Sequence, residues 1–271
     1  MGYENLVYKN LSQARKELGV SYLGSVAHSA KLMHSMEEKN IATYGVYLAA
    51  ADLSGYNVCP NHSACKEHCL FGSGNTMVDM LSERNRITNS RIKKTRLFFE
   101  NKDFFMQMLI AEIRLARLMA ELNGNEFSVR LNLTSDISIV NFVYNGKNIL
   151  EIFPDVKMYD YTKVFSNLQY SHLYPNYDLT FSYNGYNWKA CKKALKGGNR
   201  VAIVFSSKKL PKTFGGYPVI NADLYDARYL DDTNVIAGLK LKMVANHIKN
   251  HEYKKPKTPF VVEENNPLCG W

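Results

Sequence analysis

Long apolar runs are absent from this sequence. No stretch is long and apolar enough to span a bilayer, and the first ten residues, MGYENLVYKN, lack the apolar segment of a secretory signal. The sequence also has no Walker loop, no dinucleotide-binding glycine fingerprint and no nucleophile elbow. The lack of an apolar segment predicts a cytoplasmic protein without a membrane partner. The sequence also carries none of the best-marked nucleotide-binding or hydrolase motifs.

Cysteine is scarce, with five residues in a chain of 271. An odd number leaves at least one cysteine outside any intramolecular disulfide scheme, and clustered thiols in a reducing compartment more often hold metal. Acidic residues are outnumbered, because 34 Lys and Arg stand against 25 Asp and Glu and give a formal net charge of +9. That surplus favours nucleic acid or a host protein as a partner through a basic surface; the alternative is a basic surface without a partner.

Segments rich in β-branched and aromatic residues alternate with segments of helical spacing. Strands are expected at 44–50, 127–135, 156–162, 177–184 and 200–206, with shorter ones within 218–228 and 234–242. Helices are expected within 76–122, where Asp103 is placed as an N-cap, at about 140–153 and at 187–198.

This alternation implies a parallel sheet covered by helices. The expected fold class is α/β, as a partial (β/α) barrel of about six mostly parallel strands. We expect a single domain over residues 1–252, with a helical N-terminal segment. Prolines in the remaining residues, 253–271, predict an extended C-terminal tail.

The segment CPNHSACKEHC places Cys59, Cys65 and Cys69 in one loop after the first strong strand. Thiolates are the soft ligands that iron–sulfur clusters and zinc require, and a short loop can turn three sulfurs toward one centre. The gaps of five and three residues lack the paired spacing of structural zinc sites. An iron–sulfur cluster of the [4Fe-4S] type is therefore the first hypothesis. Zinc is the alternative, since His62 or His68 could complete a Cys/His site.

Two further cysteines lie outside this loop. A cubane cluster has four irons, so three cysteines leave one iron without a protein ligand. Cys269, in NPLCGW, is the candidate fourth ligand, and such a bond would pin the tail; the alternative is an incidental thiol. Cys191 lies mid-helix among lysines and is expected to be a small, semi-buried side chain.

Polar side chains follow the expected strands at their C-terminal ends, which form the active side of α/β barrels. Ser135 and Asp136 follow the second strand and Lys163 follows the third, so these three are candidates for binding a cofactor. The alternative is that loops at strand ends are polar in any case. The run 84–96, RNRITNSRIKKTR, could contact phosphates, with a solvated helix as the alternative.

A three-cysteine loop directly after the first barrel strand resembles the radical-SAM superfamily. The resemblance implies that Cys59, Cys65 and Cys69 hold a [4Fe-4S] cluster and that S-adenosylmethionine chelates the open iron. The loop departs from that family's usual spacing, and His68 stands where the family has an aromatic residue before the last cysteine. A bond from Cys269 to the fourth iron would exclude S-adenosylmethionine.

The chain as a whole resembles the phage gene product 88 family. The resembling segments are, in order, the cysteine loop, RLNLTSDIS, VKMYDYTK, YDLTFSYNG, RVAIVFSSKKLP, GGYPVINADLYDARYLDD and NVIAGLKLK. The resemblance implies a viral or prophage origin and action in the host cytoplasm. Two functions stay open: redox or radical chemistry at an iron–sulfur cluster, or non-enzymatic binding of nucleic acid or a host factor with a structural metal.

Overall fold

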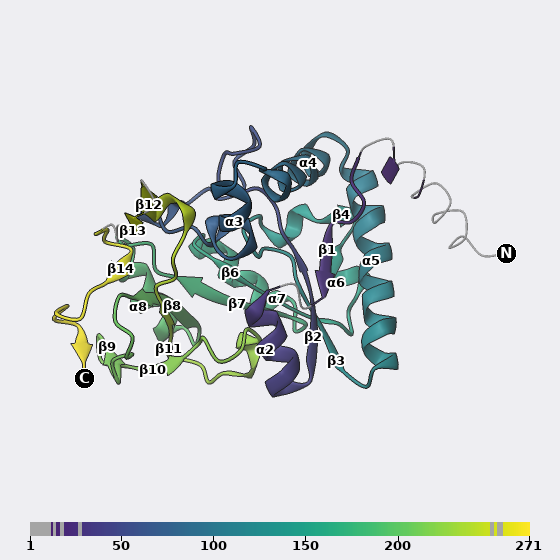
Figure 1. The fold of residues 1–271 in the computed structure, drawn as a ribbon. Helices are drawn as coiled ribbons and strands as arrows, with labels where there is room; N and C mark the ends of the chain where they lie inside the picture. Colours follow the sequence, from purple (N-terminus) through teal and green to yellow (C-terminus); the bar gives the residue numbers. More distant parts are fainter. Residues whose placement is uncertain (1–11, 13–14, 17–18, 27–28, 250–251, 254–256) are drawn as a thin grey trace.

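The structure is a computed structural model that describes residues 12, 15–16, 19–26, 29–249, 252–253 and 257–271. In this part of the chain, 11 strands form one sheet (Figure 1). Its central strands run parallel, in the spatial order β2 (Ile41–Val46), β3 (Glu126–Arg130), β6 (Lys157–Thr162), β7 (Tyr177–Ser182), β8 (Arg200–Phe205), β11 (Ile236–Lys240) and β10 (Tyr217–Asn221).

Short strands extend this parallel sheet at both ends. The antiparallel strand β1 (Gly24–Val26) pairs with β2, and β9 (Thr213–Phe214) and then β15 (Cys269–Gly270) follow β10. A further strand, β14 (Val261–Val262), pairs in parallel with the last residues of β8. No pairing among the described residues joins β1 to β15, whereas a closed barrel has no free edges. A mixed α/β fold with a large, mostly parallel sheet is therefore confirmed, and a barrel is not shown.

The remaining described elements cover the sheet or connect its strands. The helices are α2 (Ala30–Lys39), α3 (Asn75–Leu81), α4 (Arg86–Glu100), α5 (Lys102–Leu122), α6 (Ile149–Ile152), α7 (Gln169–Leu173) and α8 (Trp188–Lys196). Two separate ladders pair β4 (Val143–Tyr144) with β5 (Lys147–Asn148) and β12 (Ile248–Lys249) with β13 (Glu252–Tyr253).

The helical run expected within 76–122 is divided into three helices. Asn101 ends α4 and caps α5, because its side-chain oxygen accepts a hydrogen bond from the Phe104 N–H at 3.3 Å. Asp103, the expected cap, instead lies in the first turn of α5, where its negative charge suits the helix dipole. Figure 1 shows α5 along the β1 end of the sheet, with the C-terminal end of the chain at the opposite end.

The main apolar core lies between one face of the sheet and the helices α5, α6 and α8. Alternate strand residues belong to this core, among them Val129, Phe181 and Ile203. They meet side chains such as Phe105 of α5 and Leu195 of α8, both fully buried. Successive strand residues point to opposite faces, so the residues between them belong to the other face.

That other face is buried as well; it carries a small alanine cluster and a network of polar side chains. The Thr43 and Ser128 hydroxyl oxygens lie 2.8 Å apart, and the Tyr159 hydroxyl donates to Asp226 Oδ2 at 3.2 Å. Asp226 comes from the connection between β10 and β11 and has 0% of its surface exposed. Arg130 of β3 donates to the same carboxylate at 2.6 Å. An ion-pair network therefore links this connection to the sheet.

The described tail residues, 257–271, pack against the rest of the chain. Its strand β14 lies beside β8, where the Ser206 N–H donates to Val262 O at 2.9 Å. Its strand β15 lies beside β9, where the Lys212 N–H donates to Gly270 O at 2.7 Å. Residues 257–271 therefore complete the sheet at two places.

Candidate functional site

The cysteine loop lies at the C-terminal ends of β2 and β3. The chain turns after β2, and the Val58 N–H donates to Ala51 O at 2.9 Å. The Asp136 N–H, in the loop after β3, donates to Val58 O at 2.8 Å, and Cys59 Sγ lies 4.0 Å from Thr134 O. These contacts fix Cys59 at the edge where open parallel sheets bind their ligands.

The three loop cysteines are partly buried free thiols. Burial is the largest cause that raises the pKa of Cys59, to about 11, and it also raises the pKa of Cys69. Negative charge on Cys69 raises the Cys59 pKa further, and charge on Cys65 does the same for Cys69. Cys69 is therefore the central member, electrostatically coupled to both of the others.

The three sulfurs are neighbours without being assembled round one point. Within the described residues, no group of three or more His, Cys, Asp or Glu side chains is arranged to hold a metal ion. Cys65 lies in the 3-10 turn Ala64–Lys66, and Cys69 precedes the 3-10 turn Leu70–Gly72. Binding one metal centre through all three would therefore require the loop to draw its sulfurs together.

Two cations lie close to these thiols. Lys163 lowers the pKa of both Cys59 and Cys69, and Arg91 lowers that of Cys69, although burial outweighs them. The Arg91 guanidinium donates to Phe71 O at 3.3 Å, and its centre lies 4.9 Å from the Phe71 ring. Both positive charges would favour anionic thiolates or an anionic cluster at this position.

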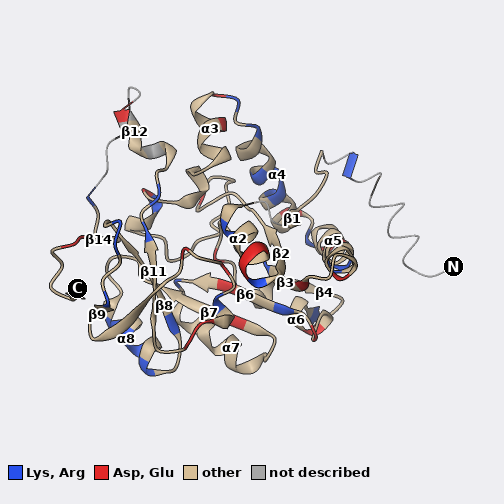
Figure 2. Cartoon of the chain, turned by 60° about the horizontal axis from the view of Figure 1, so that its bottom comes forward, with Lys and Arg blue, Asp and Glu red and all other residues tan. Residues whose placement is uncertain are grey.

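Arg91 belongs to the basic run 84–96, for which a phosphate-contacting or solvated surface was expected. It is 9% exposed, and Lys94, one helical turn further on, is 6% exposed with its ammonium 4.3 Å from the Tyr22 ring. Burial lowers the pKa of Lys94 to about 8. Figure 2 shows the remaining Lys and Arg residues spread over several elements, including α4 and α8. The centre of this run therefore faces inward, and sequence reasoning missed Arg91 as a site residue.

Asp136 and Lys163 lie near the cysteines, and a hydrogen bond joins them. Asp136 Oδ2 accepts from the Lys163 N–H at 2.7 Å, and burial raises the Asp136 pKa. Ser135 is buried, and its hydroxyl donates to Asn132 Oδ1 at 2.7 Å. Asp136 therefore holds the β6 end against the β3 loop, while the Ser135 hydroxyl stabilises the turn itself.

Asn132 organises this turn together with a buried aspartate. Its N–H donates to Asp160 Oδ1 at 2.8 Å, and its side-chain oxygen accepts from the Ile137 N–H at 2.9 Å. The Tyr177 hydroxyl donates to Asp160 Oδ2 at 3.2 Å. Burial raises the Asp160 pKa to about 7, although Arg130 lowers it. The loop that carries Asp136 is therefore rigidly held by side chains from β6 and β7.

A cavity of about 280 Å³ adjoins the cysteine loop. Val58 and Pro60, on either side of Cys59, contribute to its wall. Its other lining residues are aromatic, aliphatic or polar: Asn57, Phe98, Phe99, Lys102, Asp136, Ile137, Ser138, Asn141, Val164 and Asn167. A small molecule in this cavity would lie directly beside the thiol cluster.

Cys269 and the loop histidines have different surroundings. Cys269 lies in β15, with its sulfur 4.0 Å from Glu263 O, at the end of the sheet away from β2. Figure 1 places α3 and α4, which follow the cysteine loop, far from this end of the chain. Within the described residues, Cys269 and the loop cysteines do not form a group arranged to hold a metal ion. His68 is buried, and its Nε2 lies 2.8 Å from Thr258 Oγ1, so its ring contacts the tail.

Comparison with known proteins identifies the family of this chain. No curated protein and no solved structure matched the chain. None of the helices in the described residues has the length and apolar character needed to cross a membrane. The family described as gene product 88 matches residues 11–255, which include the cysteine loop and all seven strands of the parallel sheet. The chain therefore belongs to the gene product 88 family.

Proposed function

We propose that this protein binds an iron–sulfur cluster through Cys59, Cys65 and Cys69. The observation that carries the proposal is the placement of three partly buried free thiols in one loop, whose Cys59 contacts the turn after β3 at the C-terminal edge of the sheet. Thiolates are the usual protein ligands of such clusters. When bound, the cluster would supply one-electron redox chemistry.

The surroundings fit an anionic cluster in three respects. The thiols are partly buried, which limits access of water to a bound cluster. Lys163 and Arg91 supply positive charge that would offset the charge of the thiolates. The segment between Cys59 and Cys69 contains short turns and no α-helix or strand, so drawing the sulfurs together would not break a regular element.

The adjoining cavity gives the proposed cluster room for a small-molecule partner. Three cysteines leave one iron of a [4Fe-4S] cluster without a protein ligand. Cys269 lies in β15, at the other end of the strand order from β2, and this proposal does not use it as that ligand. The cavity beside Val58 and Pro60 is the place where an external ligand would approach, and its buried Asp136 would face that ligand.

Purification under anaerobic conditions tests the proposal. The protein should be brown, with matching amounts of iron and acid-labile sulfide and an EPR signal in its paramagnetic state. A colourless protein that carries stoichiometric zinc would contradict the cluster and favour a structural metal site. A protein that takes up neither metal after reconstitution would contradict both.

Arg91 offers a test of the charge argument. Changing Arg91→Gln should lower the reduction potential of the cluster, because a nearby positive charge stabilises the more negative, reduced state. The matched control is Arg86→Gln, because Arg86 lies on the same helix but is exposed. Protein-film voltammetry should show a lower potential for the Arg91 variant alone. Equal potentials in the two variants would contradict a role for Arg91 at the cluster.

A further inference from the structure

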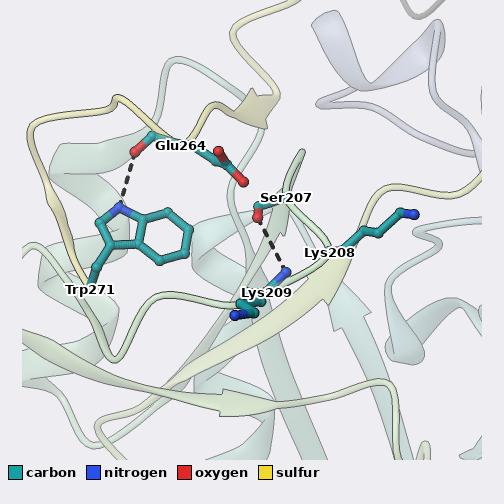
Figure 3. Close-up of a pocket in the computed structure, with 5 residues that line it drawn as sticks. All are labelled: Ser207, Lys208, Lys209, Glu264 and Trp271. Atoms are coloured by element: carbon teal, nitrogen blue, oxygen red, sulfur yellow. Dashed lines mark hydrogen bonds between the residues drawn. The ribbon is translucent and has the colours of Figure 1, made fainter.

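A second hollow lies beyond the C-terminal ends of β8 and β14. It is a groove of about 500 Å³ between the loop after β8 and the tail after β14 (Figure 3). The two strands are parallel neighbours, so both segments leave the sheet at the same edge. The lining residues are Ser207, Lys208, Lys209, Glu264 and Trp271.

Trp271 is held in place while much of its side chain stays accessible. The preceding residue, Gly270, pairs with Thr213 of β9, and the indole Nε1–H donates to Glu264 O at 3.1 Å. Trp271 is nevertheless 51% exposed. An anchored and half-exposed indole is a ready stacking surface, because its polar N–H already has a partner.

The groove also carries charges of both signs. Lys208, Lys209 and Glu264 are exposed, and none of them belongs to an ion pair that the described residues form. Figure 3 shows the indole and the Glu264 carboxylate close to Ser207 and Lys209. The Lys208 side chain extends away from the indole. A ligand complementary to this groove has a flat ring, hydrogen-bond donors on the ring edge and an anionic group.

A nucleotide with an amino-bearing base has these three features. Aromatic side chains stack on bases, and a carboxylate accepts from an exocyclic amine such as cytosine N4. Lysines neutralise phosphates, and the net charge of +9 favours a polyanion. We infer that this groove binds a nucleotide, free or within a single strand, with its base on Trp271, its amine toward Glu264 and phosphate near Lys209 and Lys208. This inference does not rest on the proposed cluster.

Intrinsic fluorescence of the full-length chain tests the inference. Oligo-dC should quench Trp271 more strongly and at lower concentration than oligo-dT, because thymine has no exocyclic amine for Glu264. The other tryptophan, Trp188, packs edge-on against Phe214 with ring centroids 4.9 Å apart and should change little. Titration with cytidine monophosphate separates the two sources of ligand. Equal affinity for it and for oligo-dC indicates a free nucleotide, whereas much tighter oligo-dC binding indicates a strand.

Variants assign the binding to this groove. Trp271→Ala should weaken oligo-dC binding by about tenfold or more, measured by anisotropy of a labelled oligonucleotide, while Trp271→Phe should retain most of it. In the double variant Lys208→Ala, Lys209→Ala, the slope of log Kd against log salt concentration should fall in magnitude by roughly 1.4. The control double variant Lys192→Ala, Lys196→Ala removes two exposed lysines from α8 and should leave that slope nearly unchanged.

Glu264→Gln tests the base preference separately, and it should reduce the discrimination between oligo-dC and oligo-dT. Two results would overturn the inference. One is the absence of quenching by both oligonucleotides and by the mononucleotide. The other is unchanged oligo-dC binding in Trp271→Ala.

Discussion

Changing Cys69→Ser should remove nearly all bound iron and sulfide from anaerobically reconstituted protein. Cys69 lies in the same loop as Cys59 and Cys65, so its loss removes one of the three proposed ligands. A serine hydroxyl is a hard donor and a poor substitute for a thiolate at an iron–sulfur cluster. Cys59→Ser and Cys65→Ser should also reduce the iron content. Metal and sulfide analysis per chain measures the effect directly.

Cys269→Ser is the matched control, since Cys269 is also partly buried but lies in β15. It should leave the iron content and the EPR spectrum unchanged, and Cys191→Ala should do the same. Loss of iron in the Cys269 variant would make that residue a ligand after all. Full iron occupancy in Cys59→Ser, Cys65→Ser and Cys69→Ser would remove the basis of the proposed cluster. Thermal melts of the metal-free variants distinguish loss of a ligand from loss of the fold.

A second large effect is expected on the free energy of unfolding when the buried Asp226 loses its charge. Asp226→Asn should lower the free energy of unfolding by about 3–5 kcal/mol, because it leaves buried cations without their counter-charge. Asp226 has 0% exposure, and it contacts Arg130 at 2.6 Å and Lys31 at 3.8 Å. Burial alone would raise the Asp226 pKa, but these two cations outweigh burial and lower it. Urea denaturation at neutral pH measures the change.

The control for this prediction is Asp232→Asn in the same connection, because Asp232 is exposed. It should change the unfolding free energy by less than about 0.5 kcal/mol. The lowered pKa of Asp226 means that its contribution is complete above the ordinary aspartate pKa and is lost as pH falls through the lowered value. The stability of Asp226→Asn should therefore vary less with acid pH than that of the unmodified protein. If Asp226→Asn lowers the free energy of unfolding as little as Asp232→Asn does, the ion-pair network round Asp226 contributes little to stability.

The parallel sheet and the position of the cysteine loop could be predicted from the sequence. The run RVAIVFS has few polar residues, as a strand buried on both faces requires, and it forms β8 in the middle of the sheet. The loop follows β2 directly, so its cysteines had to lie at the C-terminal edge. Asp136 and Lys163 follow neighbouring strands of this sheet, which is why both lie near Cys59.

Other features depend on tertiary contacts that local patterns do not encode. Arg91 and Lys94 are charged, and helix charges usually face solvent, so their burial against Phe71 and Tyr22 was not expected. Their spacing of three residues, followed by Phe98 at the next turn, was the available signal for an inward face. The pairing of β15 with β9 joins residues more than 50 positions apart, and only the folded chain shows it. The same pairing fixes Cys269 at the end of the strand order opposite β1.

X-ray absorption at the iron edge, on anaerobically purified protein, tests the central claim most directly. The proposed site predicts sulfur as the main scattering neighbour of iron, together with iron–iron scattering from a multinuclear cluster, and loss of both signals in Cys69→Ser. Iron surrounded only by nitrogen and oxygen, or a spectrum that is the same in the unmodified protein and in Cys69→Ser, would contradict it.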